Sequence, residues 1–339
     1  MSSISMVLID IKQWGNNTFK ETGLSEGFRN CSNATMTASD HPDISECTSL
    51  YYMFASFGYS LSDSESGMNH FGLDDWDTSN ITNFKSMFGN AKIGIGGIGI
   101  NHWDMSSATD IGNMFGGTTD RNDQLSLTLW DVSKVINMNG LFSSSVFNKD
   151  ISNWDVSSVE NMGGMFASNT EFNQDIGNWD TSSVKNMEYM FTGAVKFNKS
   201  LQWDTSSVTS TYAMFYNASA FNGQLSAVGD KWDVSNVTYM GKMFQGASSF
   251  VSGSIGSWNI TSVTNMSYMF KEADNFNAFL TWNTSSVISM TQLFYKAYVF
   301  NYNISSWDVD QVTGCSSFNT NGILQESYRP NFTSCTPGF

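Results

Sequence analysis

The chain is poor in the residues on which most enzymes and nucleic-acid-binding proteins depend. Its 339 residues include only three histidines and three prolines, and charged residues make up 14 % of the chain. Acidic residues outnumber basic ones by 31 to 16, which gives a net charge of −15. Such a surface repels phosphate groups, and no Lys/Arg cluster offsets it. We therefore expect no direct binding to nucleic acid or to an anionic membrane.

The sequence also lacks an apolar run long enough to span a bilayer, so we expect no membrane insertion by this segment. The N-terminal stretch MSSISMVLIDIKQW has a short apolar patch, but no basic n-region and no small-residue cleavage motif. We expect that a signal peptide preceded this chain and is absent from it.

The few histidines give no catalytic pattern. His41 precedes a proline, His70 lies in a Gly/Ser-rich connector, and both, like His102, precede the regular part of the sequence. None has a recognisable Ser or Cys nucleophile nearby. Carboxylates are plentiful, but their regular spacing singles out no glycosidase pair. We expect no catalytic residues, no cofactor and no zinc site.

The chain has a repeat instead. Tryptophans recur at intervals of 24–29 residues. In most repeats the tryptophan is followed by Asp or Asn, a Ser/Thr-rich stretch, Val, Met (often as Asn-Met), Met-Phe or Leu-Phe, Ala, Phe-Asn, and an Ile or Leu before the next tryptophan. The repeat tryptophans are Trp76, Trp103, Trp130, Trp154, Trp179, Trp203, Trp232, Trp258, Trp282 and Trp307.

The period is too short for a propeller blade of about 40–45 residues, and it suits one turn of a solenoid. The apolar residues of the Val-to-Ala stretch fall at i, i+3, i+6, i+7 and i+10, which predicts a short helix or 3₁₀ segment. The polar, Gly/Asn-rich stretch 172–179 favours a short strand or an extended segment, and stacked strands would form a narrow parallel sheet. We therefore predict an α/β repeat fold, a solenoid of about 10–12 turns that rise about 4.8 Å each.

Two polar columns keep phase with the repeat. We expect the asparagines that follow the second Phe to form a ladder between turns; they are Asn148, Asn173, Asn198, Asn222, Asn277 and Asn301. The Asp after Trp is followed two residues later by Ser in all units but the last, which favours a turn cap. Calcium between stacked carboxylates is the alternative, with Asp131, Asp155, Asp180 and Asp204 as candidate ligands.

The pattern Ser-Ser-Val-x-Asn-Met-x-x-Met-Phe-x-x-Ala-x-x-Phe-Asn-x-x-Ile-x-x-Trp-Asp resembles a mycoplasma-type surface-protein repeat, a domain of unknown function. It is similar to the repeat of BspA-like leucine-rich-repeat proteins, with Phe and Met in place of Leu and Ile. The resemblance covers residues 76–311 and implies a leucine-rich-repeat-like solenoid on a cell surface, in adhesion, without catalytic residues. The Gly-rich Lys92–Ile100 and the insert before Trp232 depart from it.

We expect residues 1–75 to form an N-terminal cap with irregular turns, 76–311 the solenoid, and 312–339 a C-terminal cap. The C-terminal end resembles the opening of a Cys-rich EGF-like segment. All four cysteines lie in the caps, and we predict disulfides Cys31–Cys47 and Cys315–Cys335. Only this connectivity avoids joining solenoid ends that are about 50 Å apart. Free buried thiols are the alternative.

Disulfides imply an oxidising compartment. Eleven Asn-x-Ser/Thr sequons are candidate glycosylation sites, namely Asn16, Asn30, Asn33, Asn80, Asn198, Asn217, Asn236, Asn259, Asn283, Asn303 and Asn331. A twelfth, Asn265, adjoins a core Met and is expected to be too crowded. We expect a secreted, cell-surface adhesion or recognition module for protein or glycan partners. The alternatives are a filament or coat subunit that self-associates end to end, and a polysaccharide-active enzyme.

Overall fold

The structure is a computed structural model of the 339-residue chain. It describes residues 10–16, 18–61, 73–92, 99–118, 125–225, 232–251 and 253–339. The chain forms two compact units, Met1–Val159 and Glu160–Phe339, hereafter unit 1 and unit 2. His70, most of the Lys92–Ile100 stretch and the insert at 226–231 lie outside the described residues.

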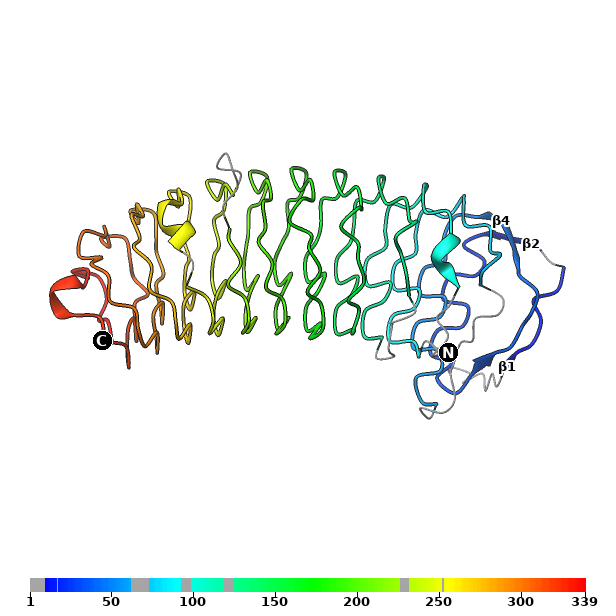
Figure 1. Ribbon diagram of the computed structural model, residues 1–339, viewed down its shortest axis with the longest axis horizontal. Coiled ribbons are helices and arrows are strands. Elements are labelled where there is room, and N and C mark those ends of the chain that lie inside the picture. Colours follow the sequence, from blue (N-terminus) through cyan, green and yellow to red (C-terminus); the bar gives the residue numbers. More distant parts are fainter. Residues whose placement is uncertain are drawn as a thin grey trace. The chain divides into compact units, whose positions relative to one another are not determined.

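The named strands all belong to the beginning of unit 1. They are β1 (Asp10–Ile11), β2 (Thr18–Glu21), β3 (Thr35–Met36) and β4 (Asp43–Cys47). β1 pairs with β3 and β2 with β4, in parallel (Figure 1). The β4 sequence DISEC buries Ile44 and Cys47 and exposes the residues around them, so its apolar positions fix which face turns to the core.

The Val-to-Ala stretch of each repeat is a chain of overlapping turns, which we call the turn segment. In unit 2, the N–H groups of Met243, Gln245 and Ala247 each donate to the carbonyl three residues earlier, over 3.1–3.2 Å. The N–H groups of the alternate residues donate to the next repeat; Lys242, for instance, bonds the Ser267 carbonyl over 2.9 Å. Half of the backbone bonds therefore close turns, and half join neighbouring repeats.

Two residues in each turn segment, four positions apart, have positive φ. Lys242 and Gly246 have φ of 59° and 69°, and Tyr268 and Glu272 have 64° and 56°. A left-handed residue cannot continue a right-handed α-helix. The helix predicted for this stretch is therefore wrong. Each turn is closed between residues three apart, so successive turns place apolar side chains on one face at i, i+3 and i+6. The spacing of these apolar residues therefore resembles that of a helix.

Among the described residues, the parallel bridges between repeats lie in the first half of the repeat. Stretch 172–179 contains no strand, so the strand predicted there is also wrong. Single parallel bridges join the residue four positions before the Met-Phe or equivalent pair of the turn segment to its equivalent in the next repeat, and this residue most often precedes a core Met. In unit 1 they link Ser49, Asn83, Asp110 and Asn137, and in unit 2 Asn161, Asn186, Ser210, Tyr239, Asn265, Ser289 and Gly314.

Short 3₁₀ helices account for the remaining regular structure that is described. They are η1 (Ile100–His102), η3 (Gly253–Ser257) and η4 (Glu326–Tyr328). η1 and η3 lie just before repeat tryptophans. In the part of the chain that the structure describes, no helix is both long and apolar enough to cross a membrane.

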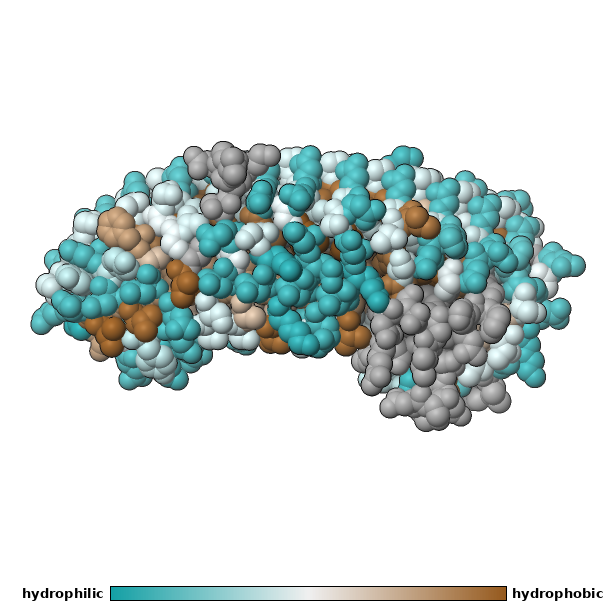
Figure 2. All heavy atoms as spheres, in the orientation of Figure 1, coloured by the Kyte–Doolittle hydropathy of each residue, from teal (hydrophilic) through white to brown (hydrophobic). Residues whose placement is uncertain are grey.

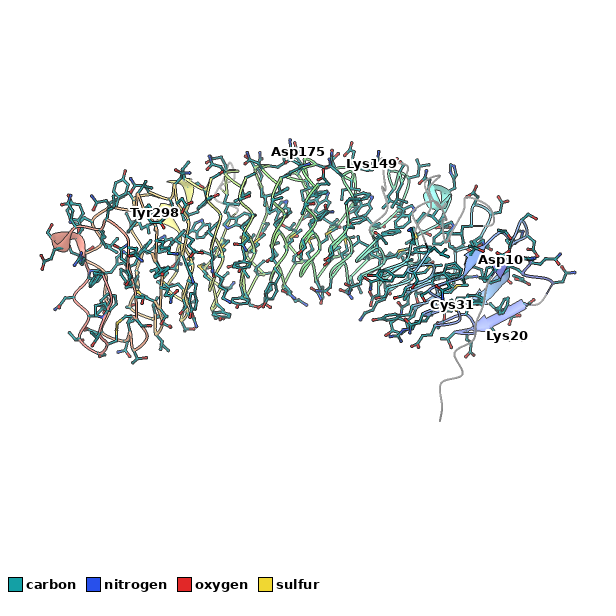
Figure 3. The ribbon with its side chains drawn as sticks, turned by 90° about the horizontal axis from the view of Figure 1, so that it is seen from below. Asp10, Lys20, Cys31, Lys149, Asp175 and Tyr298 are labelled. Atoms are coloured by element: carbon teal, nitrogen blue, oxygen red, sulfur yellow. A yellow bond between two sulfur atoms is a disulfide. The ribbon has the colours of Figure 1, made fainter. Side chains whose placement is uncertain are left out.

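Aromatic rings stack from one repeat to the next and form the core (Figure 3). In unit 2 the first file of rings is spaced 5.5–5.7 Å between centroids, with planes within 10° of parallel; it comprises Phe166, Phe191, Phe215, Phe244, Phe270 and Phe294. In unit 1 the equivalent file is Phe28, Phe54, Phe88, Phe115 and Phe142. One repeat cannot bury its own apolar face, so each depends on its neighbours.

The repeated conformation is present within residues 1–75, where the sequence predicts a cap with irregular first turns. Paired positive φ values occur at Glu26 and Asn30, and again at Tyr52 and Ser56, well before Trp76. The N–H of Phe28 donates to the carbonyl of Met53 over 2.9 Å, as between later repeats. The first 75 residues therefore already contain turn segments.

Candidate recognition surface

The Asp column is held by its own turns. Asp131 Oδ1 accepts hydrogen bonds from the Ser133 N–H over 3.1 Å and the Ser133 hydroxyl over 2.6 Å. The same pair of bonds occurs at Asp155, Asp180 and Asp204. The Ser133 hydroxyl lowers the pKa of Asp131. These bonds are those of a turn cap. Among the described residues there is no group of three or more side chains that could hold a metal ion.

The Asn column forms the predicted ladder. Asn173 Oδ1 accepts the Asn198 N–H over 3.0 Å, and Asn198 Oδ1 accepts the Asn222 N–H over 2.8 Å. Likewise, Asn222 Oδ1 accepts the Val251 N–H, and Asn277 Oδ1 accepts the Asn301 N–H. Each side chain satisfies a backbone donor of the next repeat, so this column is structural.

The C-terminal end of unit 2 is covered by its own tail. Cys315 and Cys335 form the predicted disulfide, with Cα atoms 6.0 Å apart. Phe332 and Phe339 pack on the last core ring, Phe318, at 5.1 and 5.8 Å between centroids. The tail therefore shields the end of the aromatic core from water.

The predicted Cys31–Cys47 disulfide is wrong, since both cysteines are free. Cys47 ends β4, with its thiol 3.4 Å from the Phe19 carbonyl oxygen. Cys31 ends its turn segment, and its carbonyl accepts the N–H of Gly58. Because Gly58 lies at the far end of the segment that Cys47 begins, the cysteines are at opposite ends of neighbouring segments. A disulfide needs Cα atoms within about 7 Å.

The eleven predicted glycosylation asparagines are all exposed. At Asn80 and Asn236 the nitrogen that would carry the sugar already donates to a backbone carbonyl, over 3.0 and 2.8 Å. Asn265 is half-buried, and its Oδ1 accepts the Ser267 N–H over 2.9 Å. Glycosylation at the eleven exposed residues stays a prediction. His41 and His102 are exposed.

A run of alternating tyrosines and lysines crosses neighbouring turn segments of unit 2. We call it the tyrosine–lysine file; its members are Tyr212, Lys242, Tyr268, Lys271, Tyr295 and Lys296. Lys242 Nζ lies 5.7 Å from the ring centroids of both Tyr212 and Tyr268. Lys271 Nζ lies 5.7 Å from Tyr268 and 5.2 Å from Tyr295. Lys296 Nζ follows, 5.3 Å from Tyr295. Each ammonium is within the range of a cation–π contact.

More tyrosines extend the file at one end. Tyr212 stacks on Tyr239 with centroids 4.9 Å apart, and meets Tyr189 edge-on at 5.1 Å. A Cβ atom at Gly241 would come within 3.3 Å of both Tyr212 and Tyr239, so glycine leaves room for the stacked rings. Tyr189 and Tyr239 are 44 % and 36 % exposed, so this aromatic surface is open to a partner.

The charges along the file are unevenly paired. Lys296 forms an ion pair with Glu272 at 3.4 Å. Lys242 and Lys271 form no ion pair within the described ranges. By contrast, Lys185 and Lys196 of the same unit are paired with Glu160 and Glu171.

Hydrogen bonding raises the pKa of two lysines of the file. A side-chain hydrogen bond with Tyr212 raises the pKa of Lys242, and one with Glu272 raises that of Lys296. The file thus holds two uncompensated ammonium groups between aromatic rings, on a protein of net charge −15.

Unit 1 has a different outer face on its turn segments. Small residues there form a polar groove of about 430 Å³, lined by Arg29, Tyr52, Ser86, Asn90, Asn113 and Ser144. Its guanidinium, Arg29, lies 4.4 Å over the Tyr52 ring and pairs with Glu26 at 3.1 Å. The groove therefore offers amide and hydroxyl groups, with one cation that is already compensated.

The sequence did not reveal the tyrosine–lysine file. When the repeats are aligned on tryptophan, Lys242 and Tyr268 share one position, ten residues on, and Lys271 and Tyr295 share another, thirteen residues on. Each of these columns mixes tyrosine with lysine, so no single side-chain chemistry recurs at the repeat period. The contacts between the two columns become visible only when the turn segments are stacked.

A protein-family model matches residues 22–127, 122–228 and 227–327. The three matches follow one another along the chain, and each spans several tryptophan-to-tryptophan periods. No curated protein matches the chain. Because the matches cover most of the chain, the protein belongs to the family described as Mycoplasma protein of unknown function, DUF285, of which it carries three tandem copies.

Proposed function

We propose that the protein is an extracellular recognition module, in which a continuous, BspA-like solenoid presents a binding surface to protein or glycan partners. The single observation that carries the proposal is the tyrosine–lysine file. Tyrosine provides a large, rigid contact area with a polar tip, and it is enriched at protein interfaces for that reason. On a scaffold whose other polar columns serve its own turns, this surface has no structural role that requires its exposure.

The protein's surface chemistry supports an extracellular location. The Cys315–Cys335 disulfide suits an oxidising compartment. The candidate glycosylation asparagines are accessible. Much of the face visible in Figure 2 is hydrophilic or neutral, which suits a solvated surface protein. The covered C-terminal end favours a recognition module over a filament built end to end, because little of the terminal core is left for another copy to cover.

Array binding tests the proposal. The labelled chain is applied to arrays of glycans and of extracellular proteins, and we expect reproducible, saturable binding to at least one class. The Tyr268→Ala/Tyr295→Ala variant should lose that binding. The control is Phe279→Ala/Tyr302→Ala, which removes two aromatic rings of unit 2 outside the file, 59 % and 40 % exposed. Absence of binding, or equal loss in both variants, would contradict the proposal.

A further inference from the structure

We infer that the tyrosine–lysine file binds an anionic polysaccharide, a linear glycan that carries carboxylate or sulfate groups. This inference rests on the proposed function and assigns its partner class. Lys242 lies between Tyr212 and Tyr268, and Lys271 between Tyr268 and Tyr295. Each forms a bay with an ammonium group flanked by two aromatic rings.

The charge balance of the file selects an anionic partner. Lys242 and Lys271 have no carboxylate partner among the described side chains, and Lys296 shares its charge with Glu272. Glu188 lies near the far end of the file, where Tyr189 and Tyr239 are found. The middle of the file is therefore positive within an acidic protein. Complementary charge favours encounter with an anionic ligand.

The aromatic rings select a glycan over an acidic protein. Sugar rings present flat C–H faces that pack on tyrosine, and tyrosine hydroxyls bond sugar hydroxyls. Cores of protein interfaces are depleted of lysine, whereas the file carries a lysine beside every ring that forms a bay. Bays on consecutive turn segments suit a polymer whose charged groups recur along its length.

The geometry also lowers the cost of binding. Free lysine side chains lose considerable rotamer entropy when they bind a ligand. Contact with two rings already restricts Lys242 and Lys271. Tyr212 and Tyr239 are fixed by their stacking at 4.9 Å over Gly241. The bays are therefore largely preformed before the glycan arrives.

Titration of the full chain with polygalacturonate, heparin and neutral dextran tests the inference. We expect binding to polygalacturonate, heparin or both, weakening as salt rises, and none to dextran. The first two polymers distinguish carboxylate from sulfate as the recognised group. Lys242→Gln/Lys271→Gln should weaken binding about tenfold, because it removes both lysine charges that no carboxylate of the described residues compensates. Lys242→Arg/Lys271→Arg should largely retain it.

Lys185→Gln/Lys196→Gln is the control, since it removes the same charge from two exposed positions of unit 2 outside the file. It should change affinity less than about twofold. Equal loss in the control, or dextran binding as tight as that of the charged polymers, would overturn the inference. Array binding only to proteins or neutral glycans would overturn it and leave the proposed function standing. No binding on the arrays or in titration would overturn both.

Discussion

Replacing one ring of the stacked phenylalanine file tests whether the repeats depend on each other. Phe215 is fully buried in unit 2. Its centroid lies 5.5 Å from Phe191 and 5.6 Å from Phe244, in the repeats on either side, and 3.9 Å from Phe221 of its own repeat. Phe215→Ala removes a ring that contacts three others, so it affects both neighbouring repeats.

The expected cost is large. Phe→Ala in a well-packed core lowers the free energy of unfolding by about 3–5 kcal/mol. Phe279→Ala makes the same chemical change at a side chain that is 59 % exposed in the same unit. Away from buried contacts, such a substitution changes stability by about 0.5 kcal/mol or less. The two variants should therefore differ by about 2.5 kcal/mol or more.

Guanidinium unfolding followed by tryptophan fluorescence measures the difference as a shift in midpoint. Amide hydrogen exchange then locates it. We expect faster exchange in residues 187–194 and 240–247 as well as around Phe215, because stability in stacked repeats depends on nearest neighbours. If Phe215→Ala were as stable as Phe279→Ala, or if exchange rose only within its own repeat, the coupling described here would be refuted.

Three further outcomes follow from individual contacts. Gly246→Ala should lower the free energy of unfolding by about 1–2 kcal/mol, because φ at Gly246 is 69° and the new Cβ atom would lie 2.2 Å from Asn217 Oδ1. Thermal unfolding measures this loss, and an unchanged Tm would contradict the positive φ at this residue. Hydrogen bonding lowers the pKa of Asp131 in the folded protein, so this carboxylate stabilises the fold near neutral pH, and the stabilisation is lost as pH falls below about 4. Asp131→Asn keeps the hydrogen-bond acceptor but removes the titrating group, so Tm should depend less on pH in acid. An unaltered pH profile of Tm would count against this role of Asp131. Cys335→Ser removes the disulfide, so it should release the tail and make the segment around Cys315 more susceptible to proteolysis. A thiol titration of the wild-type protein in denaturant should count two free thiols, those of Cys31 and Cys47.

The sequence predicted the interior of the repeat better than its backbone. Stacked Phe and Met positions, the Asp turn caps and the Asn ladder follow from residue chemistry at a fixed period. The turn segment does not, because residues with positive φ include Lys242, Tyr268 and Gln292, which have no left-handed preference. Bonds to the next repeat impose that conformation, and they are invisible within a single repeat.

Long-range placement explains the remaining differences. Cys31 and Cys47 are close in sequence but occupy opposite ends of stacked segments, which only the register between segments determines. The tyrosine–lysine file likewise depends on which residues of successive segments become neighbours. In both cases the sequence contains the residues, whereas the stacking decides their partners.

Backbone dihedral angles measured by NMR at non-glycine residues of the turn segments test the central claim most directly. If each segment is a chain of turns bound to the next repeat, Ala213, Lys242 and Tyr268 should show positive φ, near the 54°, 59° and 64° of the structure. Negative φ at these three residues, with hydrogen bonds from each N–H to the carbonyl four residues earlier, would contradict it.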